Sequence, residues 1–261
     1  MLKSYKGILM SYLNKLNSLD QQLEINEVHQ QVAEINEINH IIQEHKILSK
    51  APQPLGFAPD LLEELTQKTS KNERPALIVI NNLLNNFRQY LSLTYGIWSL
   101  PNLETANLIK KELQVKTALE IMAGNGYWSK ALEKVGIKTV TTDSLEWAKT
   151  SATGSKKFVN VEDLNAVDAI KKYHNLDLIL CSWSPNFGKS DLEVVKTWKK
   201  YSQAHLIFIG EKNGATNSRE FWDYNRFVKS HSLKRINQSF KSYDFIEEKI
   251  FEVEKNELEE N

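Results

Sequence analysis

The stretch ALEIMAGNGYWSKAL, residues 118–132, decides the fold class. Its apolar start is typical of a buried strand, its glycines mark a tight turn, and the residues from Trp128 onward are typical of a helix. Gly124 and Gly126 permit backbone angles that a side chain would forbid, and they let a ligand approach the main chain. The helix directs unpaired N–H groups and a positive dipole end toward the same spot. The pattern predicts a site for a phosphate or carboxylate group, or alternatively only a tight bend.

Two carboxylates, near the ends of the next two predicted strands, favour a ligand site over a simple tight bend. Asp143 lies 17 residues after Gly126, at the end of the second predicted strand. In an open α/β sheet a carboxylate there points into the ligand crevice and can accept hydrogen bonds from ribose hydroxyls. It also fits a helix N-cap, because Glu146 follows in a capping-box pattern. Asp163, just past the third strand, fits an acceptor for an adenine amino group, with Glu162 as its alternative.

Strand and helix segments alternate from about Tyr95 onward. Predicted strands lie at 117–122, 138–142, 157–161, 176–183 and 205–210, and predicted helices at 128–135, 145–150, 165–173 and 192–201. This alternation predicts a parallel sheet with helices on both faces. Two more strands, at 233–240 and 245–253, predict an antiparallel hairpin at the end of the chain.

The chain divides by its pattern into a helical region, residues 1–93, and an α/β domain, residues 94–261. Apolar residues of the first region recur at three- and four-residue spacing in two sets that are out of register, so the helix breaks near residues 23–28, as in a helical hairpin. A linker at 49–60 contains three prolines, and a further helix opens at Pro75 and presents an apolar face through Leu91. We expect these helices to cover one another and the next domain; a coiled-coil surface for a partner or a second copy is the alternative.

Composition excludes several classes of protein. Of the 261 residues, 33 are Lys or Arg and 33 are Asp or Glu, so the net charge of zero argues against bulk electrostatic binding of nucleic acid or anionic membrane. Cys181 is the only cysteine, and the six histidines are scattered, so neither an internal disulfide nor a metal site is expected. No stretch of apolar residues is long enough to span a membrane, and the start does not resemble a signal peptide, so we expect a cytoplasmic protein.

Glu120 separates two kinds of nucleotide-binding turn. A dinucleotide-binding domain usually has an apolar residue at this position and a third glycine where this chain has Ser129. A carboxylate four residues before Gly124 instead resembles the class I S-adenosylmethionine-dependent methyltransferases, where it helps hold the ammonium of the methionine part of the cofactor. Met122 stands where the commonest form of this turn has its first glycine. We expect its side chain to turn into the core; the alternative is that it crowds the methionine end of the cofactor.

More narrowly, the chain resembles a group of uncharacterised methyltransferase-like proteins. LEIMAGNGYWSKAL resembles the E-I-G-A-G-T-G-Y-W form of that group, and LILCSWSPN resembles its L-L-x-W-P-P-Y. TYGIWSLPNLETANLI resembles the segment that precedes its first strand, and IFIGEKNGATNSREFW resembles its fifth strand and the helix after it. The resemblance covers about residues 94–253. It implies a seven-stranded, mostly parallel, doubly wound sheet with an antiparallel last strand.

The resemblance also implies the site residues. Those that would bind the cofactor are Glu120, Met122, Ala123, Gly124, Asn125, Gly126, Asp143 and Asp163. The segment Trp183, Ser184, Pro185 and Asn186 is in register with the N-P-P-Y motif that orients a substrate nitrogen in amino-group methyltransferases. Ser184 replaces the first proline of that motif and Asn186 replaces its aromatic residue.

The implied function is methyl transfer from S-adenosylmethionine to an unidentified acceptor. In-line displacement at a sulfonium carbon needs mainly alignment, so no acid–base pair is expected to stand out. The alternative is a catalytically degraded protein of the same fold that acts as an interaction module through its N-terminal helices. The aromatic residues that flank the proposed crevice, or else belong to the core, are Trp98, Tyr127, Trp128, Trp147, Trp183 and Trp222.

Overall fold

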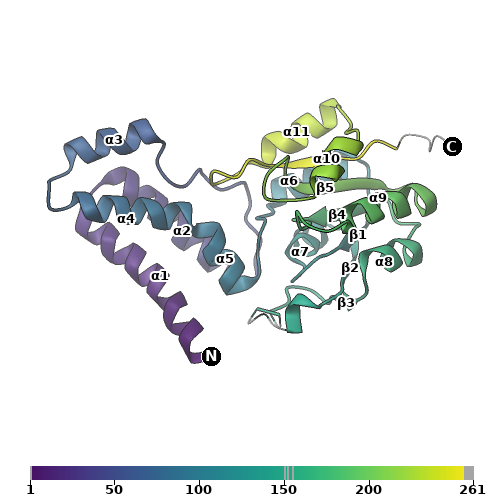
Figure 1. The fold of residues 1–261 in the computed structure, drawn as a ribbon, viewed down its shortest axis with the longest axis horizontal. Coiled ribbons are helices and arrows are strands. Elements are labelled where there is room, and N and C mark those ends of the chain that lie inside the picture. Colours follow the sequence, from purple (N-terminus) through teal and green to yellow (C-terminus); the bar gives the residue numbers. More distant parts are fainter. Residues whose placement is uncertain (1, 150, 152, 155, 256–261) are drawn as a thin grey trace.

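The computed structural model describes residues 2–149, 151, 153, 154 and 156–255, with side chains from residue 12 onward. Helices α1–α5 lie at one end of the long axis and the sheet with its covering helices at the other (Figure 1). The first five helices are α1 (Leu2–Leu23), α2 (Asn26–Gln43), α3 (Pro59–Lys68), α4 (Arg74–Asn85) and α5 (Phe87–Tyr95). The other helices are α6 (Leu103–Glu112), α7 (Tyr127–Lys134), η1 (Trp147–Lys149, a 3₁₀ turn), α8 (Ala166–Lys172), α9 (Ser190–Tyr201), α10 (Arg219–Tyr224) and α11 (His231–Ser239). None of the helices in this described part is long and apolar enough to cross a membrane.

The N-terminal region contains the two helices predicted on either side of a break, and a third predicted helix that is divided in two. Helix α1 ends at Leu23 and α2 begins at Asn26, so the expected break near residues 23–28 is confirmed. The expected helix from Pro75 through Leu91 forms as α4 and α5, which Asn86 separates. Its backbone N–H bonds to the last carbonyls of α4 and its side-chain amide donates to Asn82 O, so it ends one helix before the next begins.

The strands form one sheet in the order β3-β2-β1-β4-β5-β6. They span Thr117–Ile121 (β1), Lys138–Asp143 (β2), Glu162–Asp163 (β3), Leu178–Ser182 (β4), His205–Glu211 (β5) and Glu248–Glu252 (β6). All neighbours pair in parallel except β5 and β6, which are antiparallel. The mostly parallel sheet with an antiparallel edge is confirmed, but the sheet in the described part of the chain has six strands, not the seven expected.

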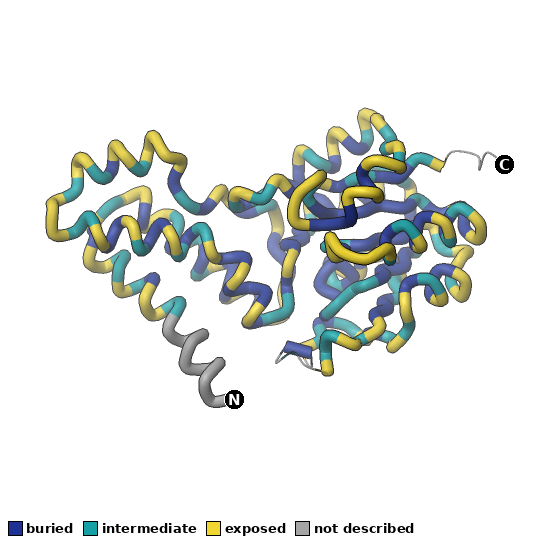
Figure 2. Tube along the Cα trace, viewed as in Figure 1, coloured by how far each residue is buried: buried dark blue, intermediate teal, exposed yellow. Residues whose placement is uncertain are grey.

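Successive residues of the central strands enter different hydrophobic clusters, because side chains alternate between the two faces of a strand. On β4, Leu178 and Leu180 belong to a cluster that includes α6, α7, α11 and the N-terminal helices. Ile179 and Cys181 belong to a second cluster, with α8 and α9. The first cluster therefore runs from the sheet into the N-terminal helices, and buried residues continue through both ends of the molecule in Figure 2.

The third predicted strand lies in the wrong place. Residues 157–161 are irregular, and only Glu162 and Asp163 pair with β2. The reason is a competing contact: Phe158 N–H donates to Asn125 O, and the Phe158 ring packs on Tyr127 with centroids 4.6 Å apart. The segment therefore crosses the glycine turn before it reaches the sheet edge.

The predicted terminal hairpin is wrong in its first half. Residues 233–240 form most of α11, whereas β6 confirms the strand within 245–253. Leu233, Ile236 and Phe240 are buried at three- and four-residue spacing, which is the period of a helix. Ser230 caps this helix, since its hydroxyl accepts the N–H of Leu233 at 3.1 Å.

Each of the other helices and strands predicted for the α/β domain has a counterpart in the structure, but one predicted helix is only a 3₁₀ turn. The segment 145–150 contains only the 3₁₀ turn η1, and Thr150 lies outside the described residues. Asp143 accepts the N–H of Leu145 at 2.7 Å, while Glu146 pairs with Lys149. The Asp143 side chain therefore closes a short turn, and the longer helix that the capping pattern predicts does not form.

Two residues of α4 give a matched test of the core. Leu84 is fully buried, whereas Ile78 on the same helix is 50% exposed. We expect Leu84→Ala to lower the free energy of unfolding by about 2–5 kcal/mol, because it removes buried apolar surface and leaves a cavity. Ile78→Ala should change it by less than about 0.5 kcal/mol. Urea unfolding followed by circular dichroism measures both, and equal effects would contradict the packing of α4.

Candidate cofactor site

A cavity of about 1190 Å³ lies at the carboxyl ends of the central strands. Its wall comes from the turn after β1, the residues after β2 and β4, the start of α8 and the segment from Ser92 to Ser99. The chain leaves β1 toward β2 and β3 on one side and returns through β4 and β5 on the other, so the cavity sits where the strand order reverses. Open α/β sheets bind their ligands at this point.

Two glycines shape the turn between β1 and α7. Gly124 has φ +56 and Gly126 has φ +74, the left-handed region that favours glycine. A Cβ at Gly126 would lie 2.5 Å from Val159 Cγ2, so this glycine allows the 157–161 segment to pack on the turn. A Cβ at Gly124 would have only Trp147 within 4 Å, at 3.9 Å. Gly124 therefore faces the cavity, and Gly126 faces the protein.

Met122 also has a left-handed backbone, with φ +51. A non-glycine residue in this region costs about 1–2 kcal/mol, which explains why a glycine suits this position. The Met122 sulfur lies 3.9 Å from Cys181 Sγ and 3.8 Å from Ser184 Oγ, and the side chain packs on the second hydrophobic cluster. The residue still lines the cavity. The side chain thus turns toward β4 while part of the residue remains in the wall.

Glu120 is a buried carboxylate on the cavity wall, only 2% exposed. Its Oε2 accepts the backbone N–H of Ser129 in the first turn of α7 at 2.7 Å. The Ser129 hydroxyl oxygen accepts a hydrogen bond from the Thr141 hydroxyl, so the hydroxyl proton of Ser129 remains free to bond the Glu120 carboxylate. Burial raises the pKa of Glu120 to about 7, helped by the charge of Asp143 and opposed by the Ser129 hydrogen bonds. A cation bound beside Glu120 would favour its charged form.

Asp143 ends β2 and organises the turn from the other side. Its Oδ2 accepts the N–H of Gly124 at 2.9 Å, and its Oδ1 accepts Leu145 N–H and the Trp147 indole N–H at 2.7 and 3.0 Å. A carboxylate has about four acceptor sites, so room remains for one hydroxyl. Asp143 lines the cavity and is 6% exposed. One side chain therefore holds the glycine turn, Trp147 and a wall of the cavity together.

Asn125 joins the turn to the N-terminal helices. Its Nδ2 donates to Tyr95 O at the end of α5 at 2.6 Å, and Gly96, with φ +68, makes the close approach possible. Its Oδ1 is buried without a hydrogen-bond partner among the described residues. Asn125 lines the cavity, but its Oδ1 exposes almost no surface, so the residue serves here to join the glycine turn to α5.

Four of the predicted site residues do not line the cavity. Gly126 and Ser184 are buried behind its wall, and Asp163 and Asn186 are exposed elsewhere. Asn165, Ala166 and Val167 line it where Asp163 was expected. The predicted residues that do line it are Glu120, Met122, Ala123, Gly124, Asn125, Asp143, Trp183 and Pro185.

Sequence reasoning missed most of the wall from Ser92 to Ser99. Of the six flanking aromatic residues, Trp98, Tyr127, Trp128, Trp147 and Trp183 line the cavity. Trp222 instead packs on Phe227 and Phe251, with ring centroids 5.4 and 4.9 Å apart. The one residue of this segment that the sequence analysis expected beside the crevice is Trp98, in the loop between α5 and α6.

No protein-family model matches the chain, and no curated protein matches it. A SAM-dependent methyltransferase from Archaeoglobus fulgidus is 14% identical over 57% of this chain and 94% of its own, with a TM-score of 0.34. The magnesium protoporphyrin IX methyltransferase of Synechocystis PCC 6803 with bound SAM is 11% identical over 58% and 78%, with a TM-score of 0.34. The plantazolicin methyltransferase BpumL in complex with SAH is 11% identical over 76% and 98%, with a TM-score of 0.40. These likenesses are weak, so function has to be argued from the site of this chain.

Glu120 predicts a pH dependence of stability. The folded state binds more protons than the unfolded state between about pH 4.5 and 7, since the pKa is raised from 4.5 to about 7. The free energy of unfolding should therefore fall as pH rises through this range. Glu120→Gln keeps an acceptor for Ser129 N–H but removes this fall, so the variant should be more stable than the natural protein at about pH 8.

Thermal and urea unfolding at several pH values measure the effect. Glu37→Gln, at an exposed position of α2, is the matched control and should follow the natural protein. If Glu120→Gln and the natural protein differ by the same amount at every pH, Glu120 does not titrate as a buried carboxylate.

Proposed function

We propose that the chain is an S-adenosylmethionine-dependent methyltransferase that acts on its acceptor by in-line methyl transfer. The observation that carries the proposal is the placement of Glu120 and Asp143 on one cavity, at the ends of neighbouring strands, with a glycine turn tied to both. The charged residues on the wall are three carboxylates, Glu120, Asp143 and Glu193, and one lysine, Lys149. This balance suits a cofactor that carries a sulfonium and an ammonium cation.

The residues present fit that cofactor. Glu120 would accept from its ammonium group, and Gly124 leaves space for it against the turn. Asp143 would accept from a ribose hydroxyl with its remaining acceptor site. The adenine end would lie against Trp147 and the Asn165–Val167 segment, which line the cavity in place of Asp163.

When bound, S-adenosylmethionine supplies an electrophilic methyl group on a good leaving group. The chain then has to hold the acceptor in line with that methyl and exclude water. Trp183 and Pro185, which follow β4, line the cavity and are positioned to contact the acceptor. Neither residue is an acid or a base, so the chemistry assigned to them is positioning.

A cofactor-binding protein without catalysis is the second candidate. The altered Met122, Ser184 and Asn186 favour it, because Ser184 replaces the first proline of the resembled motif, Asn186 replaces its aromatic residue, and neither of these two lines the cavity here. Methyl-tritiated S-adenosylmethionine added with an extract of the source cells separates the two candidates. Labelling of an extract component that Glu120→Gln abolishes supports the enzyme; binding without any labelling supports the second candidate.

Calorimetry with three ligands tests the cofactor and the placement of its methionine part. We expect S-adenosylmethionine and S-adenosylhomocysteine to bind, and Glu120→Gln to weaken both by about 10- to 100-fold, since hydrogen bonds to charged groups contribute about 1.5–3 kcal/mol. 5′-Methylthioadenosine lacks the amino-acid part, so its affinity should be the same for both proteins. Absence of binding of all three ligands to the natural protein would refute the cofactor assignment.

Met122→Gly tests whether Met122 obstructs the site. The side chain lies toward Cys181, so we expect the variant to bind S-adenosylhomocysteine within about threefold of the natural protein. A gain of more than about tenfold would mean that Met122 crowds the methionine end of the cofactor. The comparison uses protein at equal folded fraction, checked by circular dichroism, because glycine changes both the strain and the packing at this position.

A further inference from the structure

Trp98 and Trp183 form a stacked pair on the cavity wall. Their ring centroids are 5.4 Å apart and the planes meet at 26°. Trp98 is nevertheless 51% exposed, which is unusual for a tryptophan that packs on another ring. One face of Trp98 is covered by Trp183, and the exposed area leaves the other face open to a ligand.

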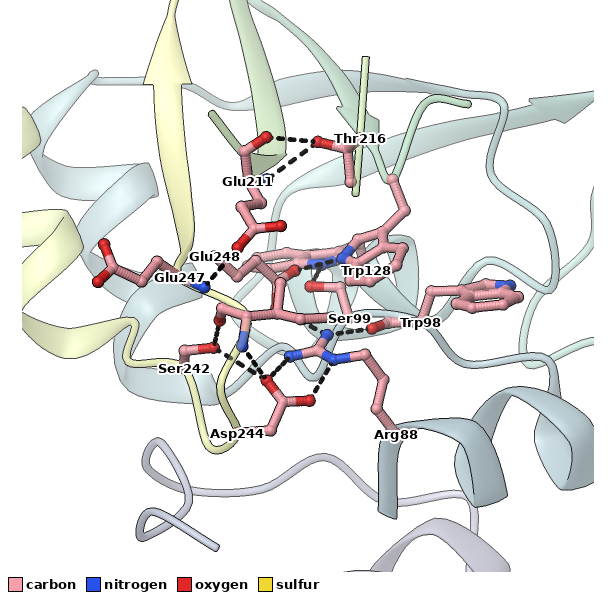
Figure 3. A network of polar contacts seen from close by, with 12 residues as sticks. Arg88, Trp98, Ser99, Trp128, Glu211, Thr216, Ser242, Asp244, Glu247 and Glu248 are labelled. Carbon is pink, nitrogen blue, oxygen red and sulfur yellow. Dashed lines mark hydrogen bonds and ion pairs between the residues drawn. The ribbon is translucent and has the colours of Figure 1, made fainter. Parts of the chain in front are cut away.

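The pair is held by a buried charged cluster. Arg88 of α5 donates to Asp244 Oδ2 at 2.7 Å and to Glu248 Oε2 at 3.0 Å, and its guanidinium also donates to the carbonyl of Trp98 (Figure 3). Glu248 in turn accepts the indole N–H of Trp183 at 2.8 Å. The Arg88 guanidinium lies 4.8 Å from the centre of the Trp183 ring. The ring of Trp183 and the backbone of Trp98 are therefore held before any ligand arrives, which lowers the entropic cost of stacking on the pair.

The position of the pair separates it from the adenine end of the site. Trp183 follows β4, whereas Asp143 and Trp147 follow β2 on the other side of β1. The cavity wall also includes Leu93 and Ile97 of the segment that carries Trp98 and Pro185 after Trp183, together with serines and Glu193 of α9. An open aromatic face beside apolar side chains favours a flat ring that can stack on it.

We propose that the open face of Trp98 is the binding platform for the methyl acceptor, and that this acceptor contains a planar aromatic ring. The inference rests on the proposed function, since it places the acceptor on the β4 side of the same cavity. Arg88 is the positioning residue: it touches no ligand in this arrangement, but it fixes the backbone of Trp98 and the ring of Trp183. Helix α5 thereby contributes to acceptor binding indirectly, through the two tryptophans that Arg88 positions.

Two alcohols of one skeleton test the platform. 2-Naphthol is planar and aromatic, whereas decahydro-2-naphthol has the same two-ring skeleton and hydroxyl but is saturated. Calorimetry and ligand-observed NMR in the presence of S-adenosylhomocysteine measure their binding to the full chain. We expect 2-naphthol to bind at least about tenfold more tightly than its saturated counterpart. Trp98→Leu should remove this preference, and Trp98→Phe should keep most of it.

The control is Tyr224→Leu, at a 77% exposed aromatic residue of α10 that does not line the cavity, and it should change nothing. S-Adenosylhomocysteine should bind Trp98→Leu within about threefold of the natural protein.

Equal binding of the two alcohols, no binding of 2-naphthol, or a preference that survives Trp98→Leu would overturn the platform. If Trp98→Leu loses S-adenosylhomocysteine as well, Trp98 belongs to the cofactor site and not to the acceptor. If 2-naphthol shows the Trp98-dependent preference but no adenosyl ligand binds, the platform stands and the proposed function fails.

Discussion

The Arg88 cluster is the contact on which the arrangement of the molecule depends. Arg88, Asp244 and Glu248 are charged side chains almost completely removed from water, and each would be costly if it were left alone. They come from α5, from the loop before β6 and from β6 itself, so the cluster forms only when the N-terminal helices, the antiparallel edge strand and the Trp98 segment are all in place (Figure 3). A buried ion pair adds little net stability over apolar residues, but it strongly penalises any arrangement that breaks it. Its effect here is to specify how the helices meet the sheet.

The glycine turn is the second constraint, and it is local. Met122, Gly124 and Gly126 all have positive φ, so the backbone between β1 and α7 is in an unfavourable conformation for ordinary residues. Two buried carboxylates hold it there: Glu120 bonds the start of α7, and Asp143 bonds Gly124 N–H. Both carboxylates also line the cavity. The groups that stabilise the turn are thus the groups assigned to the ligand, and a ligand that engages them tightens the turn as well.

The parts of the structure that could be predicted from sequence are those whose signal is local. The β1 turn, Glu120 and Asp143 belong to a continuous stretch of strand, glycines and helix, and their placement on one cavity followed from the rule that ligands bind at the carboxyl ends of parallel strands. The error at 233–240 was avoidable, because Leu233, Ile236 and Phe240 already had helical spacing. The displaced third strand was not avoidable in this way, since the contact of Phe158 with the glycine turn joins residues far apart in the sequence. Trp98 was expected beside the crevice, but the contact that positions it was not, because Arg88 and Glu248 are separated by 160 residues.

The site therefore has two halves, one built from residues close together in the sequence and one from residues far apart. The cofactor half comes mostly from residues 120–147 and depends on one turn and two strand ends. The half proposed for the acceptor needs α5, the loop between α5 and α6, the end of β4 and the last strand, which meet only in the folded chain. Substitutions far from the point where the two ligands would meet should act mainly on the ligand of their own half, since distant sites without shared partners are usually additive. Two hydrogen bonds join the halves: Asn125 of the glycine turn bonds Tyr95 O at the end of α5, and the indole N–H of Trp128 in α7 donates to Ser99 Oγ at 3.1 Å. Energetic coupling between the two halves has a hydrogen-bonded route through each of these side chains.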